Sequence, residues 1–378
     1  MKPLSEKIAG VVESATIAIS NRAKKMQAAG IDVISMSIGE PDFDTPRHIT
    51  DACIDALNRG QTHYAPSNGI PELTSAIAAK ITRENKFPCT PQQVIVSSGA
   101  KQAIYEAMEA VLNPGDETII LTPAWVSYEP CIQIAGGKPV LHEINQRTFQ
   151  LDDSLLEKVN KKTKMIIVNS PSNPTGAVFN KTSMQLVADL CEDKDIYAIS
   201  DEIYEKMIYG KEHLSLASLG DMHQRTITIN GFSKAYAMTG WRLGYAAAPR
   251  EIIVEMSKVQ QHSVSQATTF AMFGAVAALK GDQSCVEEIR QEFDRRRRYV
   301  ITELAAMGYE AAPAEGAFYA FVKVKGGDDM EVASRWLEMG HVAATPGSAF
   351  SAPGWIRLSY AASMEKLKEA LARIKKVE

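Results

Sequence analysis

Cysteine is scarce in this sequence: there are five in 378 residues, and no two of them form a Cys-x-x-Cys pair. A scattered, odd-numbered set without that spacing argues against a disulfide framework and a zinc knuckle, and it is typical of reduced thiols in the cytoplasm. The sequence also lacks an apolar run of about 20 residues, which a membrane-spanning helix needs. Its first residues lack the apolar core of a signal peptide. We therefore expect a soluble cytoplasmic protein with no membrane partner and no metal site.

An excess of positive charge is missing as well, since 41 Lys and Arg residues face 45 Asp and Glu residues and the net charge is -4. This balance argues against nucleic acid or an anionic membrane as the main partner. Four adjacent arginines, Arg295 to Arg298, form one basic cluster in a predicted helix at about 287–307. Consecutive helical residues point in different directions, so we expect these arginines on a solvated helix face or at a subunit contact.

Short β-rich runs alternate with longer helical patterns through the middle of the chain. Several runs are continuously apolar, as in strands that are covered on both faces of a mostly parallel sheet. The candidate strands are 93–97, 118–121, 139–142, 165–168, 197–200, 226–229 and 243–246. Helical patterns between them, such as 102–112 and 184–192, predict an α/β fold in which helices sandwich a mostly parallel seven-stranded sheet.

The alternation of apolar strands and helices ends near residue 287, where a long charged helix is predicted to begin. A β-like run at 316–323 and a further helix–strand–helix stretch follow, which predicts a smaller α+β domain. A helix at about 17–29 is expected to join this domain, because the termini of one small domain often lie close together. We therefore predict an N-terminal segment 1–40 that joins the small domain, a large domain 41–286 and a small domain 287–378.

The strongest chemical signal lies in the segment 230–245. Lys234 sits in a predicted turn after an apolar strand, and Arg242 follows eight residues later. A lysine amine held in such a place can form a Schiff base with an aldehyde, and an arginine can hold a phosphate in fork geometry. Pyridoxal 5'-phosphate (PLP) carries both groups. The alternative is an ordinary surface lysine and arginine beside a turn, and the other strand ends argue against it.

Polar residues also follow three other predicted strands, at the sheet edge where ligands bind in open parallel sheets. Residues 99–101 open a helix, and the amides of a helix N-terminus form a ready anion site. Two prolines and a glycine hold Asn173 in a rigid turn. Asp201 ends an apolar strand, where an ionised carboxylate needs a cationic partner such as a protonated pyridine nitrogen. Tyr204 lies three residues further on, within reach of the same ligand.

In this order the motifs resemble the class I aminotransferases among the fold-type I PLP enzymes, and they look most like the prokaryotic aspartate aminotransferase branch. The resemblance covers nearly the whole chain. It rests on the segments at 14–17, 39–46, 62–66, 69–73, 123–128, 173–176, 200–204, 230–245 and 356–360. It implies a ping-pong transaminase that moves the amino group between L-aspartate or L-glutamate and 2-oxoglutarate or oxaloacetate.

The resemblance also implies roles toward PLP for the residues at matching positions. Lys234 binds the cofactor covalently and moves the proton, Asp201 pairs with the pyridine nitrogen, Asn173 and Tyr204 hydrogen-bond the phenolic oxygen, Trp125 stacks on the ring, and Arg242 with the amides of Gly99, Ala100 and Lys101 holds the phosphate. Tyr64 matches a tyrosine that reaches the cofactor of the neighbouring subunit. We therefore expect a homodimer with shared active sites.

For the substrate, Arg357 matches the arginine that clamps the α-carboxylate, and Gly39 matches the backbone that closes over it. Asn173 and Trp125 are expected to border the substrate as well. Lys101 and Thr16 match positions near the distal carboxylate of a dicarboxylic substrate. Lys101 could instead serve the phosphate or lie on the helix surface.

Other functions stay open. Some relatives accept aromatic amino acids or prephenate, and those active on prephenate tend to carry a basic residue before the Ser-Ala-Thr segment. This chain has Val12 and Glu13 there. A PLP-dependent lyase would share the early steps, and a regulatory protein could keep PLP without turnover. A nicotinamide dehydrogenase is disfavoured because no Gly-x-Gly-x-x-Gly follows a strand.

One position departs from many relatives of the resembled family. They carry a phosphate-binding serine three residues before the lysine, and this chain has Gly231 there. Ser233 is the candidate to replace it.

Overall fold

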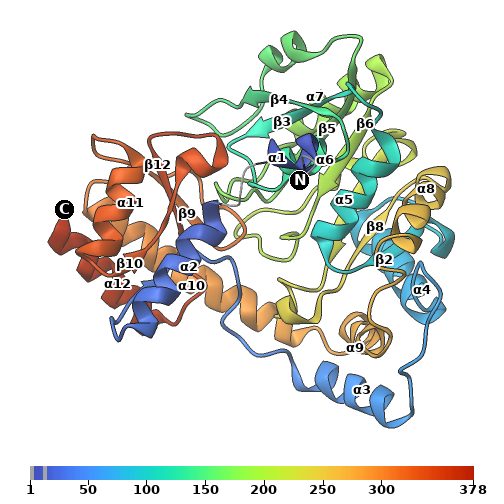
Figure 1. Cartoon of the computed structure of the whole chain (residues 1–378), viewed down its shortest axis with the longest axis horizontal. Coiled ribbons are helices and arrows are strands. Elements are labelled where there is room, and N and C mark those ends of the chain that lie inside the picture. The colour runs from blue at the N-terminus through green and yellow to red at the C-terminus, as the bar shows by residue number, and fades with distance from the viewer. Residues whose placement is uncertain (1–3, 12–14) are drawn as a thin grey trace.

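The computed structural model describes residues 4–11 and 15–378, without the side chains of residues 6 and 15–18 (Figure 1). Its helices are α1 (Glu6–Ala9), α2 (Ala15–Ala28), α3 (Arg47–Asn58), α4 (Pro71–Lys80), α5 (Ala100–Val111), α6 (Tyr128–Ile134), α7 (Lys181–Lys194), α8 (Arg250–Gln261), α9 (Thr269–Lys280), α10 (Ser284–Ala306), α11 (Asp329–Glu338) and α12 (Met364–Val377). Among the described residues, no helix is both long and apolar enough to cross a bilayer.

A seven-stranded sheet forms the centre of the larger part of the molecule. Its strands are β2 (Val94–Ser97), β3 (Glu117–Thr122), β4 (Lys138–Glu143), β5 (Thr163–Asn169), β6 (Tyr197–Asp201), β7 (Thr226–Gly231) and β8 (Gly244–Ala247). They lie in the order β2-β8-β7-β6-β5-β3-β4, and all pairings are parallel except those of β8. All seven predicted strands are therefore confirmed, and the sheet is mostly parallel as expected.

Helices cover both faces of this sheet. Buried residues of α5, α6 and α8 pack on one face, against side chains such as Ile95 and Ile199. On the opposite face, α7 packs against Ile166 and its neighbours, while α4 and α9 pack against Val96 and its neighbours. Continuous apolar strands result from this double coverage, since alternate residues on each strand face two different helix layers.

A second, smaller sheet lies beside the first, in the red and orange part of Figure 1. It is antiparallel, in the order β11-β12-β9, with β9 (Tyr319–Lys323), β11 (Thr345–Pro346) and β12 (Trp355–Ser359). The short strand β1 (Ile34–Ser35) pairs with β10 (Val342–Ala343) in parallel. Helix α2 packs beside this pair through Ala23. The described part of the N-terminal segment thus packs against C-terminal elements, while the boundaries at residues 40 and 286 stay predictions.

The four-arginine cluster in α10 does not form one solvated face. Arg295 and Arg298 are exposed, but the Arg296 side chain is only 6% exposed. Its guanidinium forms an ion pair with Asp42 and lies over the rings of Phe43 and Phe293. The expectation of a solvated position is therefore wrong for Arg296, because the chain just after β1 folds back onto α10 and covers it.

Candidate active site

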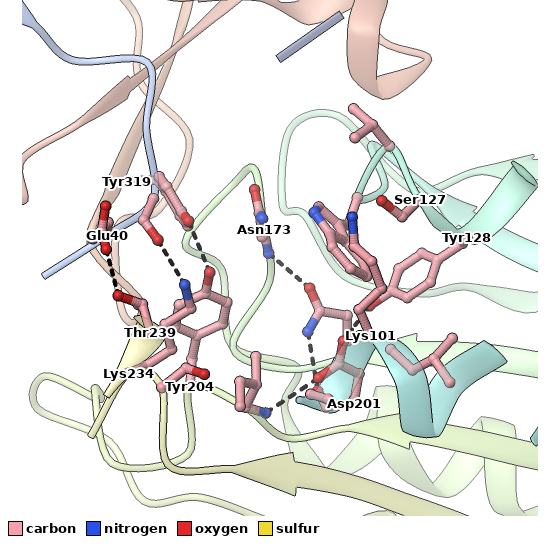
Figure 2. A pocket seen from close by; sticks show the side chains of 18 of the residues that line it. Glu40, Lys101, Ser127, Tyr128, Asn173, Asp201, Tyr204, Lys234, Thr239 and Tyr319 are labelled. Carbon is pink, nitrogen blue, oxygen red and sulfur yellow. Dashed lines mark hydrogen bonds between the residues drawn. The ribbon is translucent and has the colours of Figure 1, made fainter. Parts of the chain in front are cut away.

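A cavity of about 360 Å³ lies at the carboxyl ends of the large sheet's parallel strands, where the large sheet meets the smaller one (Figure 2). Parallel strands end at the same edge of a sheet, so the polar residues that follow β3, β5, β6 and β7 come together there. The predicted site residues that line the cavity are Gly39, Ala100, Lys101, Trp125, Asn173, Asp201, Tyr204, Ser233, Lys234, Arg242 and Arg357. The structure thus gathers residues from about 39 to 357 into one site.

Lys234 follows β7 and turns back into the cavity. Its Nζ donates a hydrogen bond to the carbonyl oxygen of Gly39 at 2.6 Å. Burial lowers the pKa of Lys234 to about 8, and the positive charges of Arg357 and Arg242 act in the same direction, while Glu40 opposes them. A larger share of the amine is therefore neutral near pH 7 than for a free lysine, and the neutral amine is the nucleophile and the base.

Asp201 ends β6 at the floor of the cavity. Its Oδ2 accepts a hydrogen bond from the Tyr128 hydroxyl at 2.6 Å, and its Oδ1 accepts one from the Ile203 amide at 3.2 Å. Burial raises the pKa of Asp201 to about 6, although both hydrogen bonds oppose the rise. A buried carboxylate is stabilised in its ionised form by a cationic partner, so Asp201 fits a protonated pyridine nitrogen.

An anion cradle lies at the N-terminus of α5. Gly99 caps this helix with a φ of +92°, and a Cβ at this position would collide with the guanidinium of Arg242. That close approach brings an arginine fork beside the free amides of the first helical turn, which is the donor set of a phosphate site. Together with Lys234 and Asp201, this donor set fits the aldehyde, ring nitrogen and phosphate of PLP.

The substitution at Gly231 has a steric reason. Gly231 ends β7, and a Cβ there would lie 2.9 Å from the Cα of Gly244 on the neighbouring strand β8. A side chain at this position would push these two strands apart. Ser233 lines the cavity two residues later, so the structure offers a hydroxyl close by.

The opposite wall of the cavity holds a buried arginine. Arg357 donates to the Asn173 side-chain oxygen at 2.8 Å and to the Ser37 carbonyl oxygen at 2.5 Å. Within residues 4–11 and 15–378, its Nε has no partner and no carboxylate is among its hydrogen-bond acceptors. Burial lowers its pKa. An uncompensated buried guanidinium is suited to bind a carboxylate in fork geometry.

Lys101 provides a second cation in the same cavity. Its Nζ lies 4.9 Å from the centre of the Trp125 ring. Burial lowers the pKa of Lys101, and no carboxylate of the described residues pairs with it. Since α5 begins at Ala100, Lys101 belongs to the first turn of the helix. Whether Lys101 binds the phosphate or the substrate stays a prediction.

The remaining predicted residues lie outside the cavity wall. Gly99 lies behind Arg242, just before the first residue of α5. Tyr64 is 90% exposed on the surface of its own chain. Thr16 belongs to α2, and its side chain lies outside the described residues, as do Val12 and Glu13.

Sequence reasoning missed several cavity residues. Tyr128 follows Trp125 by three residues in the same motif, and its hydroxyl is the only side-chain donor to the Asp201 carboxylate among the described residues. Glu40 follows Gly39, lines the cavity and accepts a hydrogen bond from Thr239. Tyr319 lies on β9, in a run identified only as a strand. The motifs contained the first two, but nothing local could place Tyr319 beside Tyr204.

A buried polar cluster supports the turn after Asp201 from behind. Glu202, Glu205 and His213 each offer an atom that could bind a metal ion, and these three atoms lie within 4.8 Å of one another. Lys80 forms an ion pair with Glu205, and Asn85 donates to both glutamates at 2.7 and 2.9 Å. The lysine already supplies the positive charge that these carboxylates need, so the cluster acts as an internal ion-pair network.

Comparisons with known proteins agree with this geometry. Residues 31–374 match the family described as aminotransferase class I and II. The chain is 44% identical over 387 residues to the probable aspartate/prephenate aminotransferase of Aquifex aeolicus, with 99% of this chain and 98% of that protein covered. It is 42% identical over 385 residues to the aspartate aminotransferase of Bacillus subtilis, with 99% and 98% covered. The solved structure of the Thermus thermophilus aspartate aminotransferase with maleate has a TM-score of 0.97 at 40% identity and matches both chains over their full length.

Proposed function

The chain belongs to the class I and II aminotransferases, and we propose that within this family it moves the amino group between L-aspartate or L-glutamate and 2-oxoglutarate or oxaloacetate. It is a transaminase that depends on PLP. The choice of substrate is the part that goes beyond the family. It rests on one observation: two cationic side chains, Arg357 and Lys101, line the cavity that also holds Lys234.

Two cations suit a substrate with two carboxylates. The buried Arg357 fork supports binding of the α-carboxylate, and Lys101 supports binding of a distal one. Maleate, which is named with the Thermus thermophilus structure, is itself a dicarboxylate. The Aquifex and Bacillus relatives both carry aspartate in their names. These observations support a dicarboxylic amino acid over an apolar one.

The residues of the cavity divide the work of transamination. PLP, when bound, supplies an electron sink that makes the substrate Cα proton acidic. Lys234 would hold the cofactor covalently and then, once its amine is free, accept the Cα proton and deliver it to the cofactor. The lowered pKa of Lys234 leaves a larger share of this amine neutral, and able to accept a proton, than in a free lysine.

Three further residues would hold the cofactor ring. The Asp201 carboxylate would hold the pyridine nitrogen protonated, and the Tyr128 hydroxyl helps to keep that carboxylate ionised. Arg357 already uses the side-chain oxygen of Asn173, which leaves the Nδ2 amide of Asn173 as a donor. That amide and the Tyr204 hydroxyl are our candidates to hydrogen-bond the phenolic oxygen.

We expect Lys101→Met to change the choice of substrate. Loss of a charge-assisted hydrogen bond should lower kcat/KM for L-aspartate by about 10- to 100-fold and leave kcat/KM for L-alanine within about threefold. Steady-state kinetics with both amino acids would measure this ratio, and Lys101→Arg, which keeps the charge, is the matched control. An equal loss for both substrates together with weaker PLP binding would place Lys101 on the phosphate instead.

Prephenate is a second candidate acceptor, and one observation favours it. The Aquifex aeolicus relative is named for both aspartate and prephenate. Prephenate is a 2-oxo acid with two carboxylates, so the same pair of cations would meet it. Val12 and Glu13, which argue against this substrate in the sequence, lie outside the described residues. Assay of the amino form of the enzyme with prephenate and with 2-oxoglutarate separates the two acceptors.

We further propose that the enzyme is a cytoplasmic homodimer whose active sites are shared. Five free cysteines support a reducing compartment. The exposed ring of Tyr64, with the exposed apolar side chains of Ile54 and Leu57 on α3, supports a surface that a second subunit covers. Tyr64 would then reach the partner's cofactor phosphate.

A further inference from the structure

Tyr319 links the two sheets at the cavity. It lies on β9 of the smaller sheet, is 1% exposed, and its hydroxyl oxygen lies 2.7 Å from that of Tyr204, which follows β6 of the larger sheet (Figure 2). The two rings meet edge to face, with their centres 5.8 Å apart. No role has so far been given to this second tyrosine.

The Tyr319 hydroxyl is fixed on a second side by Gly39. A Cβ at position 39 would overlap the Tyr319 hydroxyl oxygen, so only glycine fits there without a shift. The guanidinium of Arg357 lies over the Tyr319 ring, 4.5 Å from its centre. Gly39, Arg357 and Tyr204 together leave this hydroxyl little freedom to rotate away.

The direction of the hydrogen bond between the two hydroxyls matters for the site. Either oxygen can be the donor in this contact. If Tyr204 donates to Tyr319, the Tyr204 proton points at Tyr319 and is not available to a ligand in the cavity. If Tyr319 donates to Tyr204, the Tyr204 proton is free to point into the cavity. An arginine carries only donors, so Arg357 offers no acceptor for a Tyr319 proton that is turned away from Tyr204.

Charge favours the second arrangement. Burial raises the pKa of both hydroxyls, and it places that of Tyr204 well above the usual value. The positive charge of Arg357 opposes the rise at both hydroxyls, whereas the negative charge of Asp201 adds to the rise at Tyr204. The more acidic of two hydroxyls is the better donor, and a hydroxyl that accepts one hydrogen bond becomes a stronger donor in the next.

We propose that Tyr319 is a positioning residue for transamination, whose hydroxyl donates to Tyr204 and thereby turns the Tyr204 proton toward the phenolic oxygen of the cofactor. This inference rests on the proposed role of Tyr204. Tyr319 acts through Tyr204 and contributes no group to the reacting atoms.

The test is a pH titration of the absorption spectrum of the PLP-bound enzyme without substrate. A donor to the phenolic oxygen stabilises its negative charge, so a weaker donor moves the spectral midpoint to higher pH. Tyr319→Phe keeps the ring and its packing and removes only the hydroxyl. We expect a rise of the midpoint by about 0.5 to 1 pH unit. Tyr209→Phe is the matched control, because its buried hydroxyl donates to the Ala317 carbonyl at 2.6 Å, away from Tyr204, and it should leave the midpoint unchanged.

A double-mutant cycle separates positioning from structural damage. In the Tyr204→Phe background, Tyr319→Phe should shift the midpoint no further, because its effect passes through the Tyr204 hydroxyl. An equal shift in both backgrounds would overturn the inference, as would no shift from Tyr319→Phe alone. If Tyr204→Phe itself shifts nothing, the proposed role of Tyr204 fails and this inference fails with it. If only Tyr319→Phe is silent, the proposed function stands and this inference alone is wrong.

Discussion

Replacing Lys234 by alanine is expected to abolish transamination. The side chain would hold the cofactor covalently and would also move the Cα proton, so one substitution removes both functions. General acid–base catalysis alone accounts for about 10²- to 10⁴-fold in rate, and we expect kcat to fall by about 10⁴-fold or more. Among the described residues that line the cavity, Lys101 is the only other lysine, and its Nζ lies over the Trp125 ring, whereas that of Lys234 donates to Gly39.

The measurement is kcat with L-aspartate and 2-oxoglutarate, together with mass spectrometry after borohydride reduction. Reduction should fix PLP to the peptide that contains Lys234 in the unmodified enzyme and not in the variant. Lys258→Ala is the matched control, since its side chain is 61% exposed on α8, and it should keep full activity. Partial recovery of Lys234→Ala by small primary amines is expected. Substantial turnover without added amines would refute the assignment of Lys234.

The second large effect is expected from Asp201→Asn. Asparagine keeps the shape of the side chain but carries no charge, so nothing holds the pyridine nitrogen protonated. Removing one preorganised electrostatic partner typically costs about 10²- to 10³-fold in kcat, and we expect a loss of that size. A PLP analogue with a methylated ring nitrogen carries a permanent positive charge. It should narrow the gap in kcat between the variant and the unmodified enzyme.

Asp201 also predicts how cofactor affinity depends on pH. Its pKa in the protein without cofactor is about 6, so the carboxylate is ionised above that pH and takes up a proton below it. A neutral carboxyl no longer attracts the protonated ring, so the PLP dissociation constant should rise as the pH falls through about 6. Asp201→Asn should remove this pH dependence. Asp189→Asn is the matched control, because Asp189 is exposed on α7, and it should preserve the dependence. The same pH dependence in Asp201→Asn would show that another group controls it.

The large sheet could be predicted from the sequence because each of its strands is an apolar run between helical patterns. Burial on both faces imposes that pattern whatever the direction of the strand. For the same reason, the sequence did not show that β8 runs antiparallel to β7 and β2. Strand direction depends on where the connecting chain crosses, and the turn that carries Lys234 returns along the same edge instead of crossing over.

The candidate site was predictable where its chemistry sits at strand ends. Asp201, Asn173 and Lys234 each follow an apolar strand, and a parallel sheet brings such ends together. Tyr319 gave no such signal, because a tyrosine in a strand is ordinary and its partner Tyr204 lies more than a hundred residues away. Arg296 was misjudged for a related reason. Asp42, which pairs with Arg296 and buries it, is more than 250 residues away in the sequence. No pattern near Arg296 indicates this contact.

The central claim is that this transaminase acts on dicarboxylic amino acids, and a single half-reaction tests it most directly. The purified PLP form would be mixed separately with L-aspartate, L-glutamate, L-phenylalanine and L-alanine, and the loss of the cofactor's absorption band would be followed in time. We predict fast conversion by aspartate and glutamate and slow conversion by alanine and phenylalanine, because only the diacids meet both Arg357 and Lys101. Faster conversion by phenylalanine would contradict the proposed substrate and leave the transaminase in place. No conversion by any of the four would contradict the account of the substrate altogether.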